Sequence, residues 1–104
     1  MLYMICYDLK GEEVTNYQAW LKKNAGKLAK RAPSGWKYRG TYFFVAGFGP
    51  HTCADLWEIP NNAAFDAWHA HRDPEFLKLQ AESERFVADR PSTGFLLREA
   101  QEFG

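Results

Sequence analysis

The stretch 36–59, WKYRGTYFFVAGFGPHTCADLWEI, alternates between apolar and polar residues on both sides of a Gly-Phe-Gly-Pro sequence. This alternation predicts two antiparallel strands joined by a hairpin turn at residues 47–50. Strict alternation places Tyr38 and Tyr42 on one face of the first strand and Thr41 and Phe43 on the other. Residues 41–46, TYFFVA, are nearly all apolar, so this strand needs cover on both faces, from helices of its own chain or from another subunit.

The flanking segments predict two helices and two further strands. The expected order is strand 2–9, helix 14–32, strand 36–46, strand 51–59, helix 62–87 and strand 93–100. Thr15 and Gln18 have the spacing of a capping box, although Glu12 and Glu13 could already form a first turn. Asp73 before Pro74 is typical of a new helix N-terminus, so the second helix is expected to break there.

An order of strand, helix, strand, strand, helix, strand with right-handed crossovers predicts an α+β, ferredoxin-like βαββαβ fold. Residues 1–104 then form one domain, a four-stranded antiparallel sheet with both helices on one face. The strand centres at 3–7, 43–46 and 95–97 also present apolar side chains on the other face. The same face of a second copy is the simplest cover, so we expect a homodimer through the sheet, a dimeric α/β barrel.

The amino-acid composition limits the classes of partner that the chain is expected to bind. Thirteen basic and thirteen acidic residues balance, which disfavours nucleic acid and membrane surfaces, and aromatic residues make up 16% of the chain, more than a core of this size needs. Residues 1–7 alternate as a strand rather than resembling a signal peptide, and the chain lacks an apolar run of roughly 18 to 20 residues, so we expect a soluble protein. Cys6 and Cys53 lack metal-site spacing and are interpreted as buried free thiols in a reducing cytoplasm. The first helix has a basic outer face, interpreted as solvated surface, with an anion or partner site as the alternative. This face is formed by Lys22, Lys23, Lys27, Lys30 and Arg31.

Short motifs carry a resemblance: Trp57-Glu58 at a strand end, Ala64-Phe65 and Trp68 on the next helix, and His71 with Pro74-x-Phe76 at the break. With these residues the chain resembles the dimeric alpha-beta barrel superfamily, and most of all its antibiotic-biosynthesis-monooxygenase-type domains. Members differ in activity: cofactor-free oxidation of aromatic polyketides, heme degradation, lactone isomerisation, cyclisation, or none known.

The resemblance to the cofactor-free oxygenases implies a pocket between sheet and helices lined by Trp, Tyr and Asn. Trp68, Tyr38 or Tyr42, and Asn62 match those residue types and are the expected ligand-binding residues. Heme-degrading relatives use an Asn on the first strand and a His after the Trp. Here the first strand has no Asn and Lys78 stands ten residues past Trp68, so neither heme nor another cofactor is expected.

Two residues are candidates for proton transfer. His71, next to the break, titrates near neutral pH, and Asp73 is near enough in sequence to orient it; the alternative is a structural hydrogen bond at a helix end. Asp55 lies between Cys53 and Trp57 on the inward face of its strand, and a buried carboxylate must be paired or have a raised pKa. An ion pair with Arg39 or Arg98 is the structural alternative.

Metal binding is not expected. His69 and His71 point in different directions on one helix, and His51 and Asp55 are about 13 Å apart along a strand. The favoured hypothesis is a homodimeric, monooxygenase-like enzyme acting on a small hydrophobic or aromatic molecule. The alternative is a non-catalytic ligand-binding or stress-associated dimer, and the sequence leaves open whether the chain is an enzyme.

Overall fold

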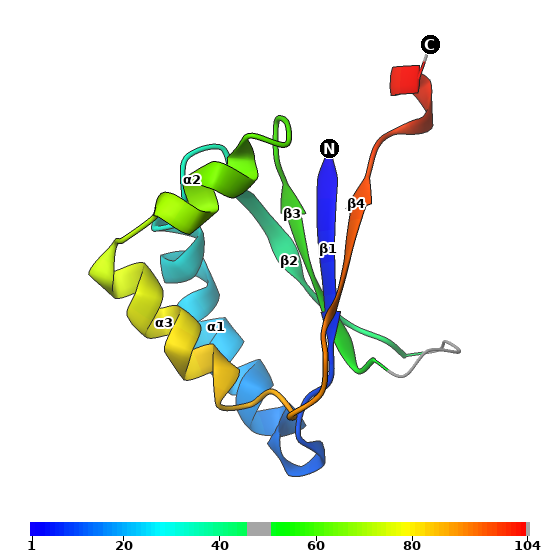
Figure 1. The fold of residues 1–104 in the computed structure, drawn as a ribbon. Coiled ribbons are helices and arrows are strands. Elements are labelled where there is room, and N and C mark those ends of the chain that lie inside the picture. Colours follow the sequence, from blue (N-terminus) through cyan, green and yellow to red (C-terminus); the bar gives the residue numbers. More distant parts are fainter. Residues whose placement is uncertain (46–50, 104) are drawn as a thin grey trace.

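The chain folds into two layers, a four-stranded sheet and a layer of helices on one of its faces (Figure 1). The computed structural model describes residues 1–45 and 51–103. The sheet has the order β2-β3-β1-β4 with every neighbouring pair antiparallel. The strands are β1 (Leu2–Tyr7), β2 (Lys37–Phe43), β3 (Cys53–Glu58) and β4 (Thr93–Leu97). The helices are α1 (Val14–Lys30), α2 (Ala64–Ala70) and α3 (Pro74–Glu84), with short 3-10 turns η1 (Gly11–Glu13) and η2 (Ala100–Phe103). The predicted ferredoxin-like fold is confirmed.

The second predicted helix is broken where the sequence indicates. α2 ends at Ala70, His71 is extended, and α3 begins with Pro74. The Asp73 carboxylate caps α3 by accepting a 3.0 Å hydrogen bond from the backbone N–H of Phe76. Proline at the first helical position lacks only an N–H that would have no partner inside the helix, so the break costs little.

The predicted capping box at Thr15 and Gln18 is wrong. The turn η1 already contains Glu12 and Glu13, and α1 continues from it without a side-chain cap. Two carboxylates in that first turn lie at the positive end of the helix dipole, which favours a start several residues earlier. The break before Pro33 is as predicted, with α1 ending at Lys30.

A β-bulge changes which faces of β2 the tyrosines occupy. Tyr38 pairs with Trp57 of β3, but the next pair is Gly40 with Leu56, so Arg39 is the extra residue. Gly40 has a φ of 119°, in the region that glycine adopts without strain. Strict alternation was therefore the wrong expectation: Tyr38 and Thr41 share the helix-facing side, and Tyr42 lies on the other. The predicted turn at residues 47–50 lies outside the described residues.

The core lies between the sheet and the helices as two adjoining clusters of buried residues. One is centred on Tyr7, Leu9, Tyr17 and Cys53, and the other on Trp36, Trp57, Ile59 and Ala64. The second cluster is unusually aromatic: the ring centroids of Trp36 and Trp68 are 4.6 Å apart, and those of Trp36 and Trp57 are 5.7 Å apart. Edge-on and tilted aromatic contacts of this kind each add about 0.5 to 1.5 kcal/mol beyond the burial of their area.

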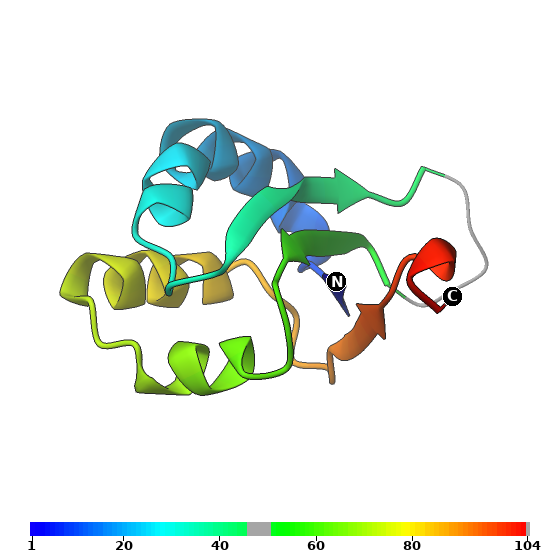
Figure 2. The same cartoon turned by 90° about the horizontal axis from the view of Figure 1, so that it is seen from above.

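The opposite face of the sheet has no helix over it in the part of the chain that the structure describes (Figures 1 and 2). It carries apolar side chains, because Leu2 and Met4 alternate with the inward Tyr3 and Ile5. The register places Phe95 of β4 beside Met4 on this face. Exposed apolar residues of this face include Leu2, Tyr42, Phe95 and Leu97, at 36% to 57% of their full area.

None of the described helices has the length and apolar character to cross a membrane.

Candidate functional site

A pocket of about 300 Å³ lies between the helix-facing side of the sheet and the helices. Its floor comes from the two central strands, through Ile5 and Tyr7 of β1 and Asp55 and Trp57 of β3. Trp68 and Phe76 form an aromatic wall, and the remaining lining residues come from the helices and the segment before β4: Tyr17, Leu28, Gln80, Ser83, Glu84, Val87 and Ser92. A largely apolar hollow with a few polar groups at one point is the usual form of a small-molecule site.

Asp55 is the end point of a chain of hydroxyl groups at the floor of this pocket. Its Oδ1 accepts hydrogen bonds from the hydroxyls of Tyr7 and Thr41, each at 2.7 Å. Tyr7 is bonded in turn to the hydroxyl of Tyr17 at 2.6 Å, and Thr41 to the hydroxyl of Tyr38. A hydroxyl has one proton to donate, so Tyr17 must donate to Tyr7 and Tyr38 to Thr41 whenever the inner pair donates to Asp55. Four hydroxyl protons are then directed towards one carboxylate.

Asp55 is the group in this network that titrates. Burial raises the pKa of Asp55, and the hydrogen bonds from Tyr7 and Thr41 oppose that rise only in part. Burial and then the charge of Asp55 raise the pKa of Tyr7 and of Tyr17 well above the ordinary tyrosine value. Burial also raises the pKa of Tyr38 to about 12. The tyrosines therefore remain protonated donors near neutral pH, and Asp55 gains or loses the proton.

The ion pair with Arg39, one form of the structural alternative given for Asp55, does not form. The Arg39 guanidinium instead pairs with Glu58, and these contacts lower the pKa of that carboxyl. Arg98 lies just beyond β4, with its guanidinium 4.0 Å from the Met1 sulfur. Asp55 faces inward as alternation predicted, but hydroxyl groups rather than a cation hold it.

Trp68, predicted to bind a ligand, and Asp55, predicted to transfer protons, line the same pocket. The Trp68 ring is wedged among aromatic neighbours, with centroid distances of 5.7 Å to Trp57 and 5.3 Å to Phe76. Only part of the ring is buried, so one portion is available to a ligand. Packing on several sides fixes its orientation before any ligand arrives, which reduces the entropy lost on binding.

The other predicted ligand residues lie elsewhere. Tyr38 is on the helix side of the sheet but does not line the pocket: its hydroxyl bonds that of Thr41, and its ring contacts Trp57 with the centroids 5.2 Å apart. Tyr42 is 57% exposed on the opposite face. Asn62 is exposed in the turn before α2, where its backbone carbonyl accepts from Phe65. Their roles in ligand binding remain predictions that the geometry does not favour.

His71 lies outside the pocket, at the break between α2 and α3. Its Nε2 is 2.7 Å from the backbone carbonyl oxygen of Arg31, to which it donates, and its ring packs 5.1 Å from that of Phe76. Asp73 does not orient it, because that carboxylate caps α3 and pairs with Arg31 at 3.2 Å. This arrangement matches the structural alternative given for His71: it ties the break to the end of α1.

Both cysteines are buried free thiols, as predicted. Burial raises the pKa of the Cys53 thiol to about 12, so it is neutral near pH 7 and unsuited to act as a nucleophile. Among the described residues, no three His, Cys, Asp or Glu side chains come together as a metal site would require.

The sequence pattern did not predict Tyr7, Tyr17 and Thr41 as site residues. Tyr17 belonged to the apolar stripe of the first helix and Tyr7 to a strand, so both were interpreted as core. Their hydroxyls matter because β1 and β2 lie on either side of β3 and the Tyr17 hydroxyl of α1 reaches that of Tyr7, which places three separate segments around Asp55. A buried tyrosine needs a hydrogen-bond partner, and that requirement was the available signal.

Comparison with known proteins gives a match by shape alone. No protein-family model matches the sequence, and no curated protein matches it. Solved structures do match. An uncharacterized NIPSNAP domain protein from Burkholderia xenovorans superimposes with a TM-score of 0.71 at 13% identity, covering 95% of this chain and 94% of that one.

Two further structures have the same arrangement. A dabb family protein with a ferredoxin-like fold from Mesorhizobium loti has a TM-score of 0.64 at 12% identity, with 94% of this chain and 96% of that one covered. A structure described as an antibiotic biosynthesis monooxygenase has a TM-score of 0.58 at 19% identity, with 96% and 99% covered. Identities this low establish shared architecture and not shared activity. In its fold, this chain is therefore similar to these ferredoxin-like proteins, in agreement with the resemblance stated from its sequence.

Proposed function

We propose that this chain is a small homodimeric protein that binds a small hydrophobic or aromatic molecule in the pocket beside Asp55 and Trp68. We further propose that it acts there as a cofactor-free, monooxygenase-like enzyme. The observation that carries the proposal is the meeting of a carboxylate of raised pKa with an aromatic wall in one pocket. Perturbed titratable groups in a pocket are typical of catalytic sites.

The proposed chemistry begins with proton removal by Asp55. A carboxylate with a raised pKa is a stronger base than an ordinary one, and it suits a substrate with an acidic C–H or O–H next to an aromatic system. The resulting anion is electron-rich and reacts with dioxygen, named here as the co-reactant. In the balanced reaction a CH₂ group becomes C=O and the second oxygen atom leaves as water, so dioxygen is the sole oxidant.

The surrounding residues have separate parts in this proposal. Trp68 and Phe76 hold the flat substrate by ring contacts, since both line the pocket. Tyr7 and Thr41 orient the Asp55 carboxylate and keep one oxygen occupied, which leaves the other oxygen to accept the proton. The name of one structural neighbour, an antibiotic biosynthesis monooxygenase, is compatible with this chemistry.

One observation favours the non-catalytic alternative. Asp55 already accepts two hydrogen bonds from the protein, an arrangement that also occurs where a buried carboxylate only joins strands. The two functions differ in turnover, because a binding protein would hold the same ligand without consuming oxygen. The location we propose is cytoplasmic, which the two buried free thiols support.

Oxygen uptake with anthrone as the probe tests the proposal, measured above the rate without protein. We expect uptake by the native protein, a loss of about tenfold or more in Asp55→Asn with binding nearly retained, and weaker binding in Trp68→Phe. Trp20→Phe is the control, because Trp20 lies outside this pocket. Binding that depends on Trp68 without uptake would establish the non-catalytic alternative. Binding that is unchanged in Trp68→Phe would refute both.

A further inference from the structure

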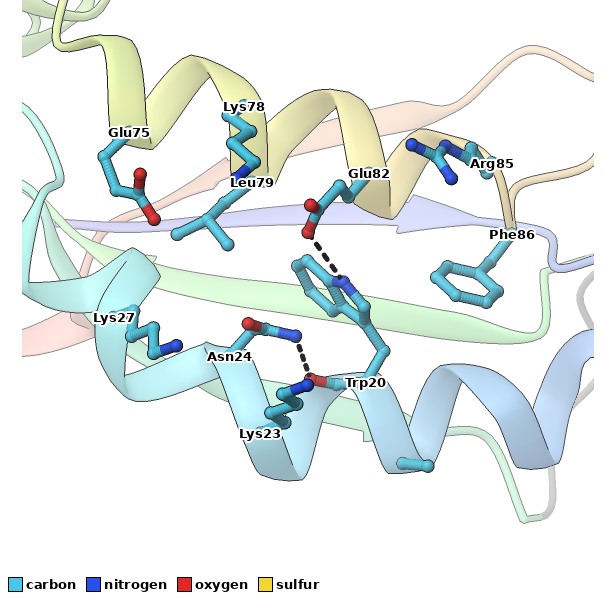
Figure 3. A pocket seen from close by; sticks show the side chains of 11 residues that line it. Trp20, Lys23, Asn24, Lys27, Glu75, Lys78, Leu79, Glu82, Arg85 and Phe86 are labelled. Atoms are coloured by element: carbon cyan, nitrogen blue, oxygen red, sulfur yellow. Dashed lines mark hydrogen bonds between the residues drawn. The ribbon is translucent and has the colours of Figure 1, made fainter.

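A second hollow lies on the outer side of the helix layer, in the gap between α1 and α3 (Figure 3). Its volume is about 500 Å³, and α1 and α3 form its two long sides. It is a different space from the pocket beside Asp55, because the two share no lining residue. Nothing in the proposed function uses it.

Cationic side chains line both sides of this groove. Lys23 and Lys27 come from α1, Lys78 comes from α3, and Arg85 is the residue that caps the C-terminus of α3. Against these four there are two acids, so the lining carries a net charge of +2 in a chain whose total charge is zero. The ion pairs within the described residues use Arg31, Arg39 and Arg90, and none uses a cation of the groove.

Among the described residues, neither acid of the groove forms an ion pair with one of its cations. Glu82 accepts a 3.2 Å hydrogen bond from the indole N–H of Trp20, which directs its carboxylate to the aromatic ring (Figure 3). Glu75 lies on the first turn of α3, where its charge favours the helix N-terminus. Cations facing one another across two helices repel, and an anion between them relieves that repulsion.

The base of the groove is apolar and held in position. Figure 3 shows Trp20 and Leu79 pointing into the gap between the helices. The Trp20 ring is stacked on Tyr17, with 11° between the ring planes and 6.2 Å between centroids. Asn24 is only 7% exposed, and its amide donates to the Trp20 carbonyl oxygen at 3.0 Å. An aromatic surface thus lies directly beside the cationic rim.

We propose that this groove binds a small organic anion, a carboxylate or phosphate attached to an aromatic or other apolar ring. The acidic group lies between the lysines of α1 and the cations of α3, and the ring lies against Trp20 and Leu79. Lysine binds such a group as a point charge, so the site accepts either acid, and the ring contact supplies selectivity over inorganic ions.

The test follows the Trp20 indole N–H signal by two-dimensional NMR, assigned through Trp20→Phe. The probes are benzoate, phenyl phosphate and the neutral benzyl alcohol, titrated to about 10 mM. Comparing benzoate with phenyl phosphate separates the two acids. We expect saturable shifts with at least one anion and none with the alcohol.

Two matched double variants then test whether the lysines of the groove bind the anion. Lys23→Gln with Lys27→Gln removes two cations from the groove, whereas Lys22→Gln with Lys30→Gln removes two exposed cations of the same helix outside it. We expect about fivefold weaker binding for the first pair, because exposed ion pairs are each worth a factor of roughly 1.5 to 5. For the second pair we expect little change. Equal losses in both pairs, equal shifts with benzyl alcohol, or no shift with either anion would each overturn the proposal.

Discussion

At the scale of single residues, the site depends on where hydroxyl protons point. Asp55 would be an expensive group to bury alone, and Tyr7 and Thr41 supply the hydrogen bonds that make its position tolerable. The same burial that makes it costly raises its pKa. Burial of the carboxylate is therefore the physical cause both of its cost to stability and of its proposed use as a base. Two substitutions test this, Asp55→Asn and Tyr7→Phe.

Asp55→Asn is expected to change the dependence of stability on pH. Because the folded-state pKa of Asp55 is raised, its favourable contribution is complete below the unfolded pKa of about 3.9 and is lost as pH rises through the folded pKa. The native protein should therefore lose unfolding free energy relative to Asp55→Asn from about pH 4 upward. Urea unfolding at several pH values measures this. A difference between the two proteins that stays constant with pH would contradict the raised pKa of Asp55.

Tyr7→Phe removes the central hydroxyl of the network. It deprives Asp55 of a donor and Tyr17 of its partner, so we expect a loss of about 1 to 3 kcal/mol of unfolding free energy. Tyr42→Phe is the control, because that hydroxyl bonds the Arg39 carbonyl oxygen at an exposed position and should cost under about 0.5 kcal/mol. Chemical denaturation gives both values. Similar losses for the two variants would show that the buried network adds no stability.

At the scale of elements, one bulge decides which side chains reach the site. Gly40, with its positive φ, allows the extra residue that returns Thr41 to the helix-facing side beside Asp55. Without the bulge, Thr41 would face the opposite side of the sheet. The break before α3 works in a similar way, because it turns α2 so that Trp68 packs onto Trp36 and Trp57.

The same substitution is expected to have opposite effects at two glycines. Gly40→Ala forces a side chain into a positive φ, 3.3 Å from the Tyr42 ring, and should destabilise by about 1 to 3 kcal/mol. Gly26 is exposed inside α1 with open space around it, so Gly26→Ala should stabilise by about 0.5 to 1 kcal/mol. Thermal unfolding measures both. A neutral Gly40→Ala would mean that the bulge relaxes without cost.

Asp73 is expected to stabilise α3 as a cap rather than as an ion pair. Asp73→Ala should cost about 1 kcal/mol, and Asp73→Asn should keep most of that stability because the amide oxygen can still accept from Phe76. The pair with Arg31 is exposed on the arginine side and contributes little. Denaturation of both variants distinguishes the two interactions. Equal losses would assign the role to the ion pair.

At the scale of the whole molecule, the sheet has more apolar surface than its helices cover (Figures 1 and 2). Leu96 on the helix side of β4 is itself 45% exposed, so this edge strand is open on both faces. Such a surface usually marks an interface. A second copy is the partner we propose, because the same face of an identical chain matches it and the neutral total charge sets up little repulsion.

Phe95→Glu is expected to convert the dimer to a monomer. The substitution places a carboxylate in the proposed sheet interface, where leaving it unpaired costs several kcal/mol. Leu77→Glu is the matched control, because Leu77 on α3 is 42% exposed and Phe95 is 44% exposed. Sedimentation equilibrium at micromolar concentration gives the masses. A native protein that is already monomeric there would remove the dimer from the proposal.

The sequence by itself determined the element order, the helix break at Pro74 and the inward direction of Asp55, because hydrophobic period and proline geometry are local properties. Through the motifs around Trp57 and Trp68 it also pointed to proteins that share this fold. Only the tertiary structure decided that hydroxyls rather than Arg39 hold Asp55, since its partners come from three separate segments. It likewise decided the face of Tyr42 and the place of His71, because a bulge and a loop contact depend on strand register and packing that no local pattern records.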